Sequence, residues 1–242
     1  MIQIKFVDQN NRLEKQTGFM NPIRPEDVED LLHADVFVCV PITDYEVPLE
    51  TLKYIRDHSD AVIIFDAHGP TNTVNVLGER HIRFWIDRDL WLPYIDVLKM
   101  NLEESRCCWF KQEYDMSELK PLHDVDTGHL DGLAEHVLAH GVGALIVTLD
   151  AGGSAVYFKE NGKSRKEIVP SVPVSEVVDT TGCGDSFAGG LGFGLLSDSP
   201  DYIKAAKYAN ALGAQRTQGR TFEVFKSLED TNSMIRDAYG SL

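Results

Sequence analysis

Four apolar segments that alternate with helical stretches constrain the fold of this chain more than any other feature. They read VFVCV at 36–40, AVIIFDA at 61–67, DVLKMN at 96–101 and ALIVTL at 144–149. Continuous apolar runs rich in β-branched residues are typical of strands that are buried on both faces of a parallel sheet, under the helices that connect them. The alternation predicts a three-layer α/β/α fold with a mostly parallel central sheet.

The remaining segments fit this arrangement. Helices are predicted at residues 25–32, 49–57, 85–92, 130–138, about 185–196, 202–212 and 228–239. A hairpin joins SAVYF to RKEIV across Asn161-Gly162, because this dipeptide favours a tight turn. A second small hairpin is expected at 2–19, where the polar residues 9–11 separate two strand-like segments, as a lid or edge of the fold. With no internal repeat and no linker, residues 1–242 are predicted to form a single domain.

The chain is acidic, with 38 Asp and Glu residues against 23 Lys and Arg and a formal net charge of -15. Such a surface repels phosphate backbones, which argues against nucleic acid as a partner. The first residues do not resemble a signal peptide, and no apolar run is long enough to cross a bilayer, so we expect no membrane partner. The four cysteines lack zinc-site spacing and indicate reduced thiols in a cytoplasmic protein.

The segment VVDTTGCGDSFAGG at 177–190 places glycines and a carboxylate where an apolar helix begins. Gly182 and Gly184 flank a single residue, which indicates a backbone shape that side chains would obstruct. The first amide groups of a helix lack internal partners and carry the positive end of its dipole, so this turn can hold an anion. Ligands of parallel sheets bind beyond the carboxyl ends of the strands. The polar residues that close or follow predicted strands are Asp66, Asn101, Thr148 and Asp179.

Two other phosphate-binding motifs do not fit the sequence. A Walker A loop would end at the Gly-Lys-Ser of 162–164, but Tyr157 stands at its first glycine position. A dinucleotide-binding fingerprint would start at Gly182, but Phe187 stands at its third glycine position. On these patterns alone, a plain glycine-rich helix start remains the alternative.

The whole string DTTGCGDSF at 179–187 resembles the D-T-x-G-A-G-D signature of the ribokinase family, the PfkB-type carbohydrate kinases, with Cys183 in place of alanine. Other segments resemble elements of that family in the same order: KMNLEE at 99–104, IVTLDAGG at 146–153, and Ala209-Asn210-Ala211 with the later Gly219. The resemblance extends from about residue 30 to about residue 225 and implies a ribokinase-like fold.

The resemblance implies an ATP-dependent phosphotransferase that moves the γ-phosphate to an alcohol group of a sugar or a sugar-like small molecule. Asp185 would be the base that accepts the proton of the attacking hydroxyl. The amides of Gly182, Cys183 and Gly184 would form the anion hole for the charge that develops on the transferring phosphoryl group. Cys183 would contribute its amide only, as a small residue rather than a reactive thiol.

The implied cofactors are ATP and Mg²⁺. Asn101 and Glu104 would organise Mg²⁺ and its waters, since hard oxygen ligands suit this ion. They would equally serve as the N-cap and third residue of a helix in a capping box. Thr148 and Gly153 would lie along the nucleotide, with Asn210 near its adenine, although a role on the helix surface fits Asn210 as well.

Other candidate residues have structural alternatives. Asp179 and Thr181 would help to form the monovalent-cation site, for K⁺, that many relatives contain, and a structural turn explains them equally well. His136 and His140 stand four residues apart on a predicted helix, as metal ligands do, but no third ligand is evident, so a solvated helix face is the preferred interpretation. His68 departs from the asparagine that relatives often carry there, so no catalytic role is assigned to it.

Two departures from the family bear on function. Asp150 replaces a glycine of the turn on the nucleotide side. The family's opening segment, with most of its sugar-contacting residues, would precede residue 1, which a truncated chain, a natural short form or a partner chain would each explain. The alternatives to a sugar kinase are a weak or inactive nucleotide-binding or regulatory protein, and a nucleoside or vitamin kinase of the same fold. The strand edge at 2–19 favours a homodimer.

Overall fold

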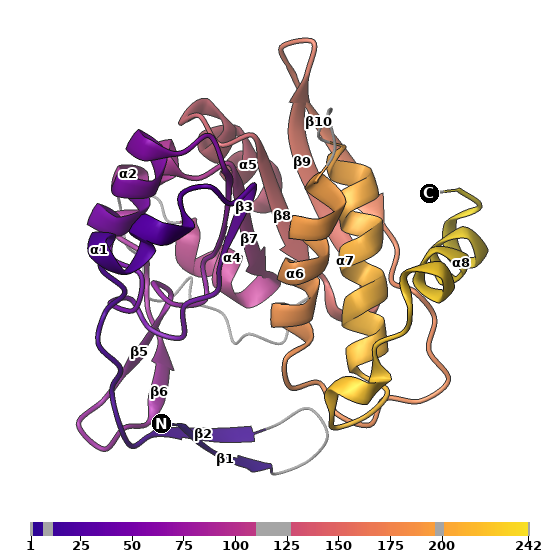
Figure 1. The fold of residues 1–242 in the computed structure, drawn as a ribbon, viewed down its shortest axis with the longest axis horizontal. Helices are drawn as coiled ribbons and strands as arrows, with labels where there is room; N and C mark the ends of the chain where they lie inside the picture. The colour runs from indigo at the N-terminus through magenta and orange to yellow at the C-terminus, as the bar shows by residue number, and fades with distance from the viewer. Residues whose placement is uncertain (1, 7–11, 110–126, 197–200, 242) are drawn as a thin grey trace.

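The computed structural model describes residues 2–6, 12–109, 127–196 and 201–241, and a six-stranded sheet forms its centre (Figure 1). The strand order is β10-β9-β8-β7-β4-β3. The strands are β3 (Val36–Cys39), β4 (Val62–Asp66), β7 (Val97–Asn101), β8 (Ala144–Thr148), β9 (Ser154–Glu160) and β10 (Lys163–Val169). Strands β3, β4, β7 and β8 are parallel, and β9 runs antiparallel to β8 and β10. The prediction of a mostly parallel sheet is confirmed.

Helices cover both faces of this sheet (Figure 1). They are α1 (Pro25–Val28), α2 (Leu49–His58), α3 (Arg88–Trp91), α4 (Leu102–Cys108), α5 (Leu130–Ala139), α6 (Cys183–Leu195), α7 (Tyr202–Arg216) and α8 (Leu228–Tyr239). The predicted helix at 85–92 is shorter than expected, because α3 gives way to a 3₁₀ turn at Leu92–Tyr94 that contains a proline. The predicted helix at about 185 begins two residues earlier, at Cys183.

The strands alternate their side chains between two apolar cores, which makes the fold three-layered. In β4, Ile63 and Phe65 face the core completed by α2, α4 and α5, whereas Ile64 faces the core completed by α6 and α7. Strands β7 and β8 alternate in the same way. Because continuous burial on both faces requires apolar residues at every position, these strands lack the polar alternation of a half-exposed sheet.

Two glycines allow α6 to lie directly against α7. A Cβ atom on Gly190 would stand 2.7 Å from the Cα of Ala209, and a Cβ on Gly194 would stand 2.5 Å from the Cα of Ala205. These distances are shorter than van der Waals contact, so a side chain at either position would push the helices apart. The close contact fixes the position of α6 and of the glycine-rich turn at its start.

Small hairpins lie at the end of the molecule toward which the parallel strands run (Figure 1). The predicted hairpin at 2–19 is present as β1 (Ile2–Phe6) paired with β2 (Arg12–Gln16); its turn at 9–11 lies outside the described residues. A second hairpin, of β5 (Asn72–Val74) and β6 (Arg80–Ile82), was not expected. The predicted tight turn between β9 and β10 is confirmed, with φ values of +51° at Asn161 and +77° at Gly162.

No helix within the described ranges of the chain is both long enough and apolar enough to span a membrane.

Candidate active site

The carboxyl ends of three parallel strands bring polar residues to one edge of the sheet. Asp66 ends β4, Asn101 ends β7 and Thr148 ends β8. The strand register sets Asp66 beside Lys99 and Asn101 beside Thr148. Side chains that lie far apart in the sequence are therefore neighbours at this edge.

Glycines let two cationic side chains lie close to the first turn of α6. Gly182, the N-cap of α6, has a φ of +79°, a left-handed conformation that side chains rarely adopt. A Cβ built on Gly182 would stand 3.3 Å from Nε of Arg216, and one built on Gly184 would stand 3.2 Å from Nζ of Lys99. The helix N-terminus and the two cations together suit a negatively charged group.

The three amides of this turn are not equivalent. The amide of Cys183 donates a hydrogen bond to the carbonyl of Thr180 at 3.2 Å, which closes the turn. An anion at the helix start therefore competes with this bond for the Cys183 amide, so we expect the amides next to it to carry more of the binding. The thiol of Cys183 is half-buried and reduced.

Asp185 lies in the first turn of α6 with an exposed side chain. A Cβ on Gly182 would stand 3.8 Å from its Oδ2 atom, so the carboxylate lies beside the N-cap of the helix. A solvent-accessible carboxylate at this position can accept a proton from a bound alcohol.

A buried ion pair underlies the glycine turn. Nζ of Lys99 lies 2.6 Å from Oδ2 of Asp66, and their side chains are 6% and 3% exposed. Burial alone would lower the pKa of Lys99, but the surrounding carboxylates of Asp66, Glu104 and Asp185 raise it. Burial raises the pKa of Asp66, which the ammonium group opposes. Lys99 therefore stays charged and places a fixed positive charge under Gly184.

Asn101 and Glu104 form a capping box, which was one of the two interpretations of these residues from the sequence. Oδ1 of Asn101 accepts a hydrogen bond from the Glu104 amide at 2.7 Å, and the Asn101 amide donates to Oε2 of Glu104 at 2.8 Å. Burial raises the pKa of Glu104, but its hydrogen bond with His68 and the charge of Lys99 hold it below its usual value. Glu104 is buried and both its oxygens are engaged in hydrogen bonds, so these residues suit Mg²⁺ through its waters rather than by direct contact.

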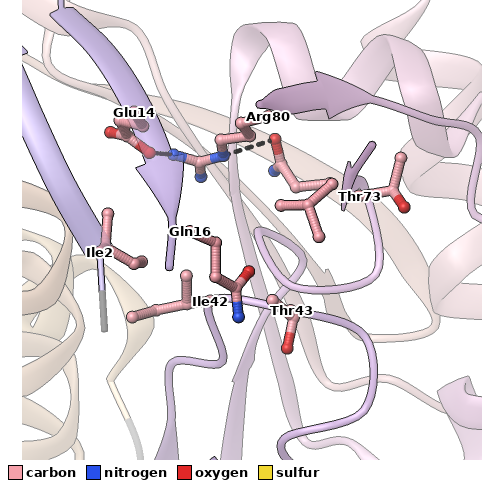
Figure 2. Close-up of a pocket in the computed structure, with 9 residues that line it drawn as sticks. Ile2, Glu14, Gln16, Ile42, Thr43, Thr73 and Arg80 are labelled. Carbon is pink, nitrogen blue, oxygen red and sulfur yellow. Dashed lines mark hydrogen bonds and ion pairs between the residues drawn. The ribbon is translucent and has the colours of Figure 1, made fainter. Parts of the chain in front are cut away.

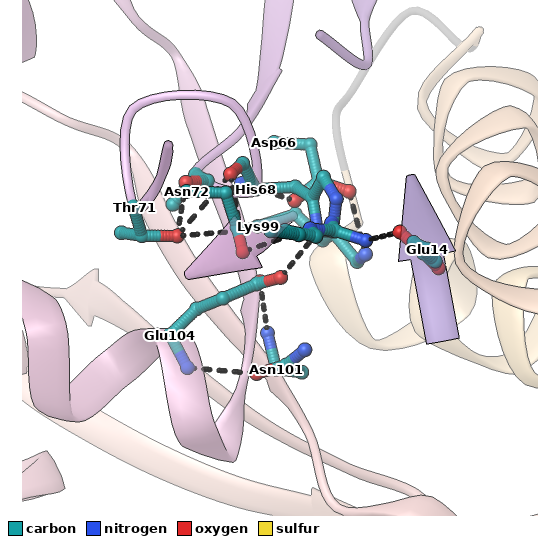
Figure 3. Close-up of polar contacts among 10 residues, drawn as sticks. Glu14, Asp66, His68, Thr71, Asn72, Lys99, Asn101 and Glu104 are labelled. Carbon is teal, nitrogen blue, oxygen red and sulfur yellow. Dashed lines mark hydrogen bonds and ion pairs between the residues drawn. The ribbon is translucent and has the colours of Figure 1, made fainter. Parts of the chain in front are cut away.

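A chain of polar contacts joins this capping box to the N-terminal hairpin (Figure 3). Nδ1 of His68 lies 2.7 Å from Oε1 of Glu104, and since a carboxylate only accepts, Nδ1 carries the proton. Arg80 of β6 lies beside His68, with Nη2 at 3.2 Å from Nδ1, and donates from Nε to Oδ1 of Asn72 at 3.0 Å. The same guanidinium forms an ion pair with Glu14 of β2. Polar contacts therefore connect the capping box at the end of β7 to the N-terminal hairpin.

A small pocket opens between the two hairpins on this side of the molecule (Figure 2). Its polar lining comes from both hairpins and from the loop after β3. The lining residues are Ile2, Glu14, Gln16, Ile42, Thr43, Asn72, Thr73, Val74 and Arg80. The volume is only about 10 Å³, which is room for one water molecule and not for a sugar.

A larger groove lies between α8 and the chain that follows β10. It measures about 760 Å³ and is lined by the loop residues 172–175, by Gln218 and by one face of α8. The amides of Val178 and Asp179 donate to the carbonyl of Thr217, next to Gln218 in the chain. The groove therefore opens beside the segment that leads into the glycine turn, and its volume is within the usual range for small-molecule sites.

The residues predicted to contact the nucleotide lie at the β8–β9 turn and on α7. Thr148 is half-buried at the end of β8. Gly153 has a φ of +89°, and a Cβ there would stand 2.1 Å from the carbonyl of Val169, so the backbone alone requires glycine. Asn210 is only 7% exposed, which makes its helix-surface interpretation wrong. Its amide nitrogen donates to the carbonyls of Val169 and Pro170 at 3.1 and 3.2 Å.

Asp179 and Thr181 form the turn before Gly182. The Thr181 amide donates to Oδ1 of Asp179 at 2.9 Å, and this hydrogen bond holds the pKa of Asp179 below its usual value. Nη2 of Arg216 lies 3.6 Å from Oδ2 of the same carboxylate. A guanidinium therefore already faces Asp179, where the sequence analysis placed a monovalent cation, and the role as a structural turn has direct support in these contacts.

Several residues of this edge had no role in the sequence analysis. Lys99 was part of a family motif without a function, although a lysine inside a buried strand indicates a buried partner. Arg80 and His68 gave no usable signal, because their partners lie on other elements. His136 and His140 do have a third group beside them, Asp89 on α3. This carboxylate was not evident from the sequence, because α3 lies far from α5 along the chain.

Comparison with solved structures shows the fold. A pyrophosphate-dependent kinase of the ribokinase family has a TM-score of 0.65 and 17% identity, over 90% of this chain and 69% of the other. A ribokinase from Thermotoga maritima has a TM-score of 0.59 and 20% identity, over 89% and 62% of the two chains. The fold is thus ribokinase-like.

Comparison with curated proteins finds kinases for different acceptors. Adenosine kinase 2 of Arabidopsis thaliana is 25% identical over 175 residues, which cover 69% of this chain and 46% of the relative. A fructokinase of Rhizobium leguminosarum bv. trifolii is 42% identical over 72 residues, 30% of this chain and 21% of the relative. The chain spans at most about half the length of these relatives. The profile of the pfkB family of carbohydrate kinases matches residues 62–221, so the chain belongs to this family.

Proposed function

We propose that this chain carries the catalytic centre of an ATP-dependent phosphotransferase that moves the γ-phosphate to an alcohol group of a sugar or sugar-like molecule. One observation carries the proposal: the exposed carboxylate of Asp185 borders a glycine-lined helix N-terminus that has the buried cation Lys99 beneath it. Phosphoryl transfer needs a group that accepts the alcohol proton and fixed positive charge at the transferring phosphoryl. Asp185 supplies the first from the first turn of α6, and Lys99 of β7 with the helix N-terminus supplies the second.

Each group of this site has its own role in the proposed reaction. Asp185 orients the acceptor hydroxyl and takes its proton. The helix N-terminus at Gly182 and Gly184 stabilises the charge on the phosphoryl oxygens, with Lys99 adding to the local positive potential. A retained base and an open anion site favour an active enzyme over an inactive nucleotide-binding protein.

ATP suits the groove at α8, which has room for a base and ribose and opens beside the segment that leads into the glycine turn. Among the solved relatives, a ribokinase from Arabidopsis thaliana is described in complex with ribose and ATP, and other relatives are described as pyrophosphate-dependent. The groove favours the nucleotide, because pyrophosphate has no base to fill it. Asn101 and Glu104 would hold Mg²⁺ through its waters, and this ion would neutralise charge on the phosphates when bound.

The acceptor class is a sugar or sugar-like molecule on the resemblance to the family alone, because the pocket between the two hairpins, at about 10 Å³, is too small to hold it. A nucleoside is the competing class, because the adenosine kinases of Arabidopsis thaliana match a longer part of this chain than the sugar kinases do.

A panel of sugars, polyols and nucleosides with ATP·Mg²⁺, and a parallel panel with pyrophosphate, tests the proposal. We expect phosphorylation of at least one polyhydroxylated acceptor, lost by several orders of magnitude in Asp185→Asn while ATP affinity changes little. Asp57→Asn, which alters an exposed carboxylate on α2, is the matched control. An Asp185→Asn variant as active as the control would exclude the assigned base. ATP binding without turnover of any acceptor would reduce the chain to a nucleotide-binding module.

A further inference from the structure

Three side chains that can bind a metal meet on the face of the sheet opposite α6. They are Asp89 of α3 and the pair His136 and His140 of α5. Nε2 of His136 lies 2.8 Å from Oδ1 of Asp89, and Nε2 of His140 lies 4.0 Å from Oδ2. The three ligand atoms all lie within 4.8 Å of one another, and the described part of the chain holds no second group of this kind.

The contacts of the two rings determine how each Nε2 atom is presented. Nδ1 of His140 lies 2.8 Å from the carbonyl of His136, and since a carbonyl only accepts, Nδ1 carries the proton and Nε2 is left toward Asp89. Metal-binding histidines are commonly oriented by such a bond from the second ring nitrogen. Nε2 of His136 lies 2.7 Å from Nη2 of Arg88 and 2.8 Å from Oδ1 of Asp89, so a guanidinium and a carboxylate both contact this ring nitrogen.

Arg88 lies beside both groups, and its Nε also donates to Oδ1 of Asp89 at 2.8 Å. A metal ion between Asp89 and His136 would take the place of their direct contact and of the contact between Arg88 and His136. Arg88 would keep its bonds to Asp89 and to the carbonyl of Cys108.

We propose that Asp89, His136 and His140 bind a divalent transition metal ion of the zinc class, which links α3 to α5. In a tetrahedral zinc site the ligand atoms stand roughly 3.4 Å apart, from metal–ligand distances of about 2.0–2.1 Å. The observed separations of 2.8 and 4.0 Å bracket this value. The side chains are 46%, 29% and 36% exposed, so they can adjust and leave a position for water.

The ligand set also selects the ion. Two imidazoles and one carboxylate favour zinc, nickel or copper over Mg²⁺ and Ca²⁺, which prefer oxygen ligands. The formal net charge of -15 attracts cations to the surface in general. The site is separate from the glycine turn and does not depend on the proposed kinase activity.

Isothermal titration of the full chain with Zn²⁺, with Mg²⁺ as the comparison ion, tests the proposal. We expect one Zn²⁺ per chain in the unmodified protein and at least a tenfold weaker binding in His140→Gln and in Asp89→Asn. His58→Gln is the matched control, because His58 is exposed and its Nδ1 lies 2.9 Å from the carbonyl four residues earlier, as in His140.

Circular dichroism shows whether each variant is folded, and thermal unfolding with excess Zn²⁺ gives a second readout, since a ligand of the native state raises the melting temperature. If Asp89→Asn proves unfolded, the exposed His140→Gln decides alone. Unchanged Zn²⁺ affinity in His140→Gln would overturn the proposal, because the ion would then be held by other groups, such as the Cys183 thiol. Absence of Zn²⁺ binding to the unmodified protein would overturn it as well.

Discussion

Replacing Lys99 with methionine removes the positive charge that faces a carboxylate inside the protein. In the native structure Nζ of Lys99 lies 2.6 Å from Oδ2 of Asp66, and both side chains are almost completely buried. Methionine fills most of the same volume without the charge. The change therefore isolates the electrostatic part of the interaction from packing.

The expected cost follows from this burial. Removing one partner of a buried, hydrogen-bonded ion pair leaves an uncompensated charge, which costs about 3–5 kcal/mol of unfolding free energy. In a chain of this size, 1 kcal/mol corresponds to about 2–4 °C in melting temperature, so we expect a decrease of about 6–20 °C. An exposed ion pair would cost less than about 1 kcal/mol.

The loss of unfolding free energy in Lys99→Met should also depend on pH. Burial raises the pKa of Asp66 already in the native protein, and without the ammonium group the shift becomes larger. A carboxyl whose folded-state pKa is raised contributes stability that is complete below its unfolded pKa of about 3.9 and is lost as the pH rises through the folded pKa. The Lys99→Met variant should therefore be closer to the native protein at pH 5 than at pH 8.

Urea denaturation followed by tryptophan fluorescence at pH 5 and pH 8 measures both effects. The double variant Asp66→Asn with Lys99→Met should lose about 1–3 kcal/mol less than the sum of the single variants, since the two groups are in contact. A Lys99→Met variant that loses less than about 1 kcal/mol at pH 8, or equally much at both pH values, would refute the assignment of a buried, charged pair.

Three further predictions concern α6 and the capping box. Gly190→Ala places a Cβ 2.7 Å from the α7 backbone and should cost about 1–3 kcal/mol, whereas Gly189→Ala meets no atom within 4 Å and should stabilise by up to about 1 kcal/mol, both read from urea midpoints. Asn101→Ala removes the α4 cap and should cost about 1 kcal/mol. It should also raise the Mg²⁺ concentration needed for half-maximal activity. Burial raises the pKa of Glu104, but the hydrogen bond to His68 and neighbouring positive charge hold it below its usual value. The contribution of Glu104 to stability should therefore be complete above about pH 4.5 and be lost below it, and Glu104→Gln should lack this acid limb in denaturation between pH 3 and pH 6.

The elements that the sequence predicts well are those whose periodicity reflects burial on a whole face. Strands β4, β7 and β8 are apolar at nearly every position because both faces are covered. Helix α5 shows its buried side at helical spacing, with Leu130, Leu133, Ala134, Val137 and Leu138 all buried. Such patterns arise because a whole face of the strand or helix is buried, and they do not depend on any single contact. They can therefore be recognised in the sequence without knowing which residues pack against that face.

The elements that escaped prediction are those held by contacts between distant segments. The hairpin of β5 and β6 has strands of three residues each, too short to show a period. It is held instead by Arg80, which pairs with Glu14, and by the amide of Gln16, which donates to the carbonyl of Gly78 at 2.7 Å. Gly78 has a φ of +78°, and a Cβ there would stand 2.2 Å from the carbonyl of Gln16. Neither partner is visible from the local sequence.

The candidate site shows the same difference between local patterns and contacts between distant segments. The glycine turn with Asp185 and the capping box of Asn101 and Glu104 are local motifs, so residue types at fixed spacing indicate them. The partners that give these motifs their electrostatic character come from other strands. Lys99 meets Asp66 only because the register of β4 and β7 sets them side by side.

The glycines of this segment perform two tasks, and their order along the helix explains why one segment serves both. At the start of the helix, Gly182 and Gly184 let Arg216 and Lys99 lie close to the backbone, so positive charge gathers at the amides. Two to three turns later, Gly190 and Gly194 let α7 lie directly on α6. The close contact between α6 and α7 fixes the position of the helix start. A helix free to shift by about 1 Å against the sheet would move Asp185 relative to the Lys99–Asp66 pair, and the positioning of reacting groups does not tolerate such a displacement. A substitution at Gly190 should therefore reduce phosphoryl transfer even though it lies outside the site, and it should do so by misplacing Asp185.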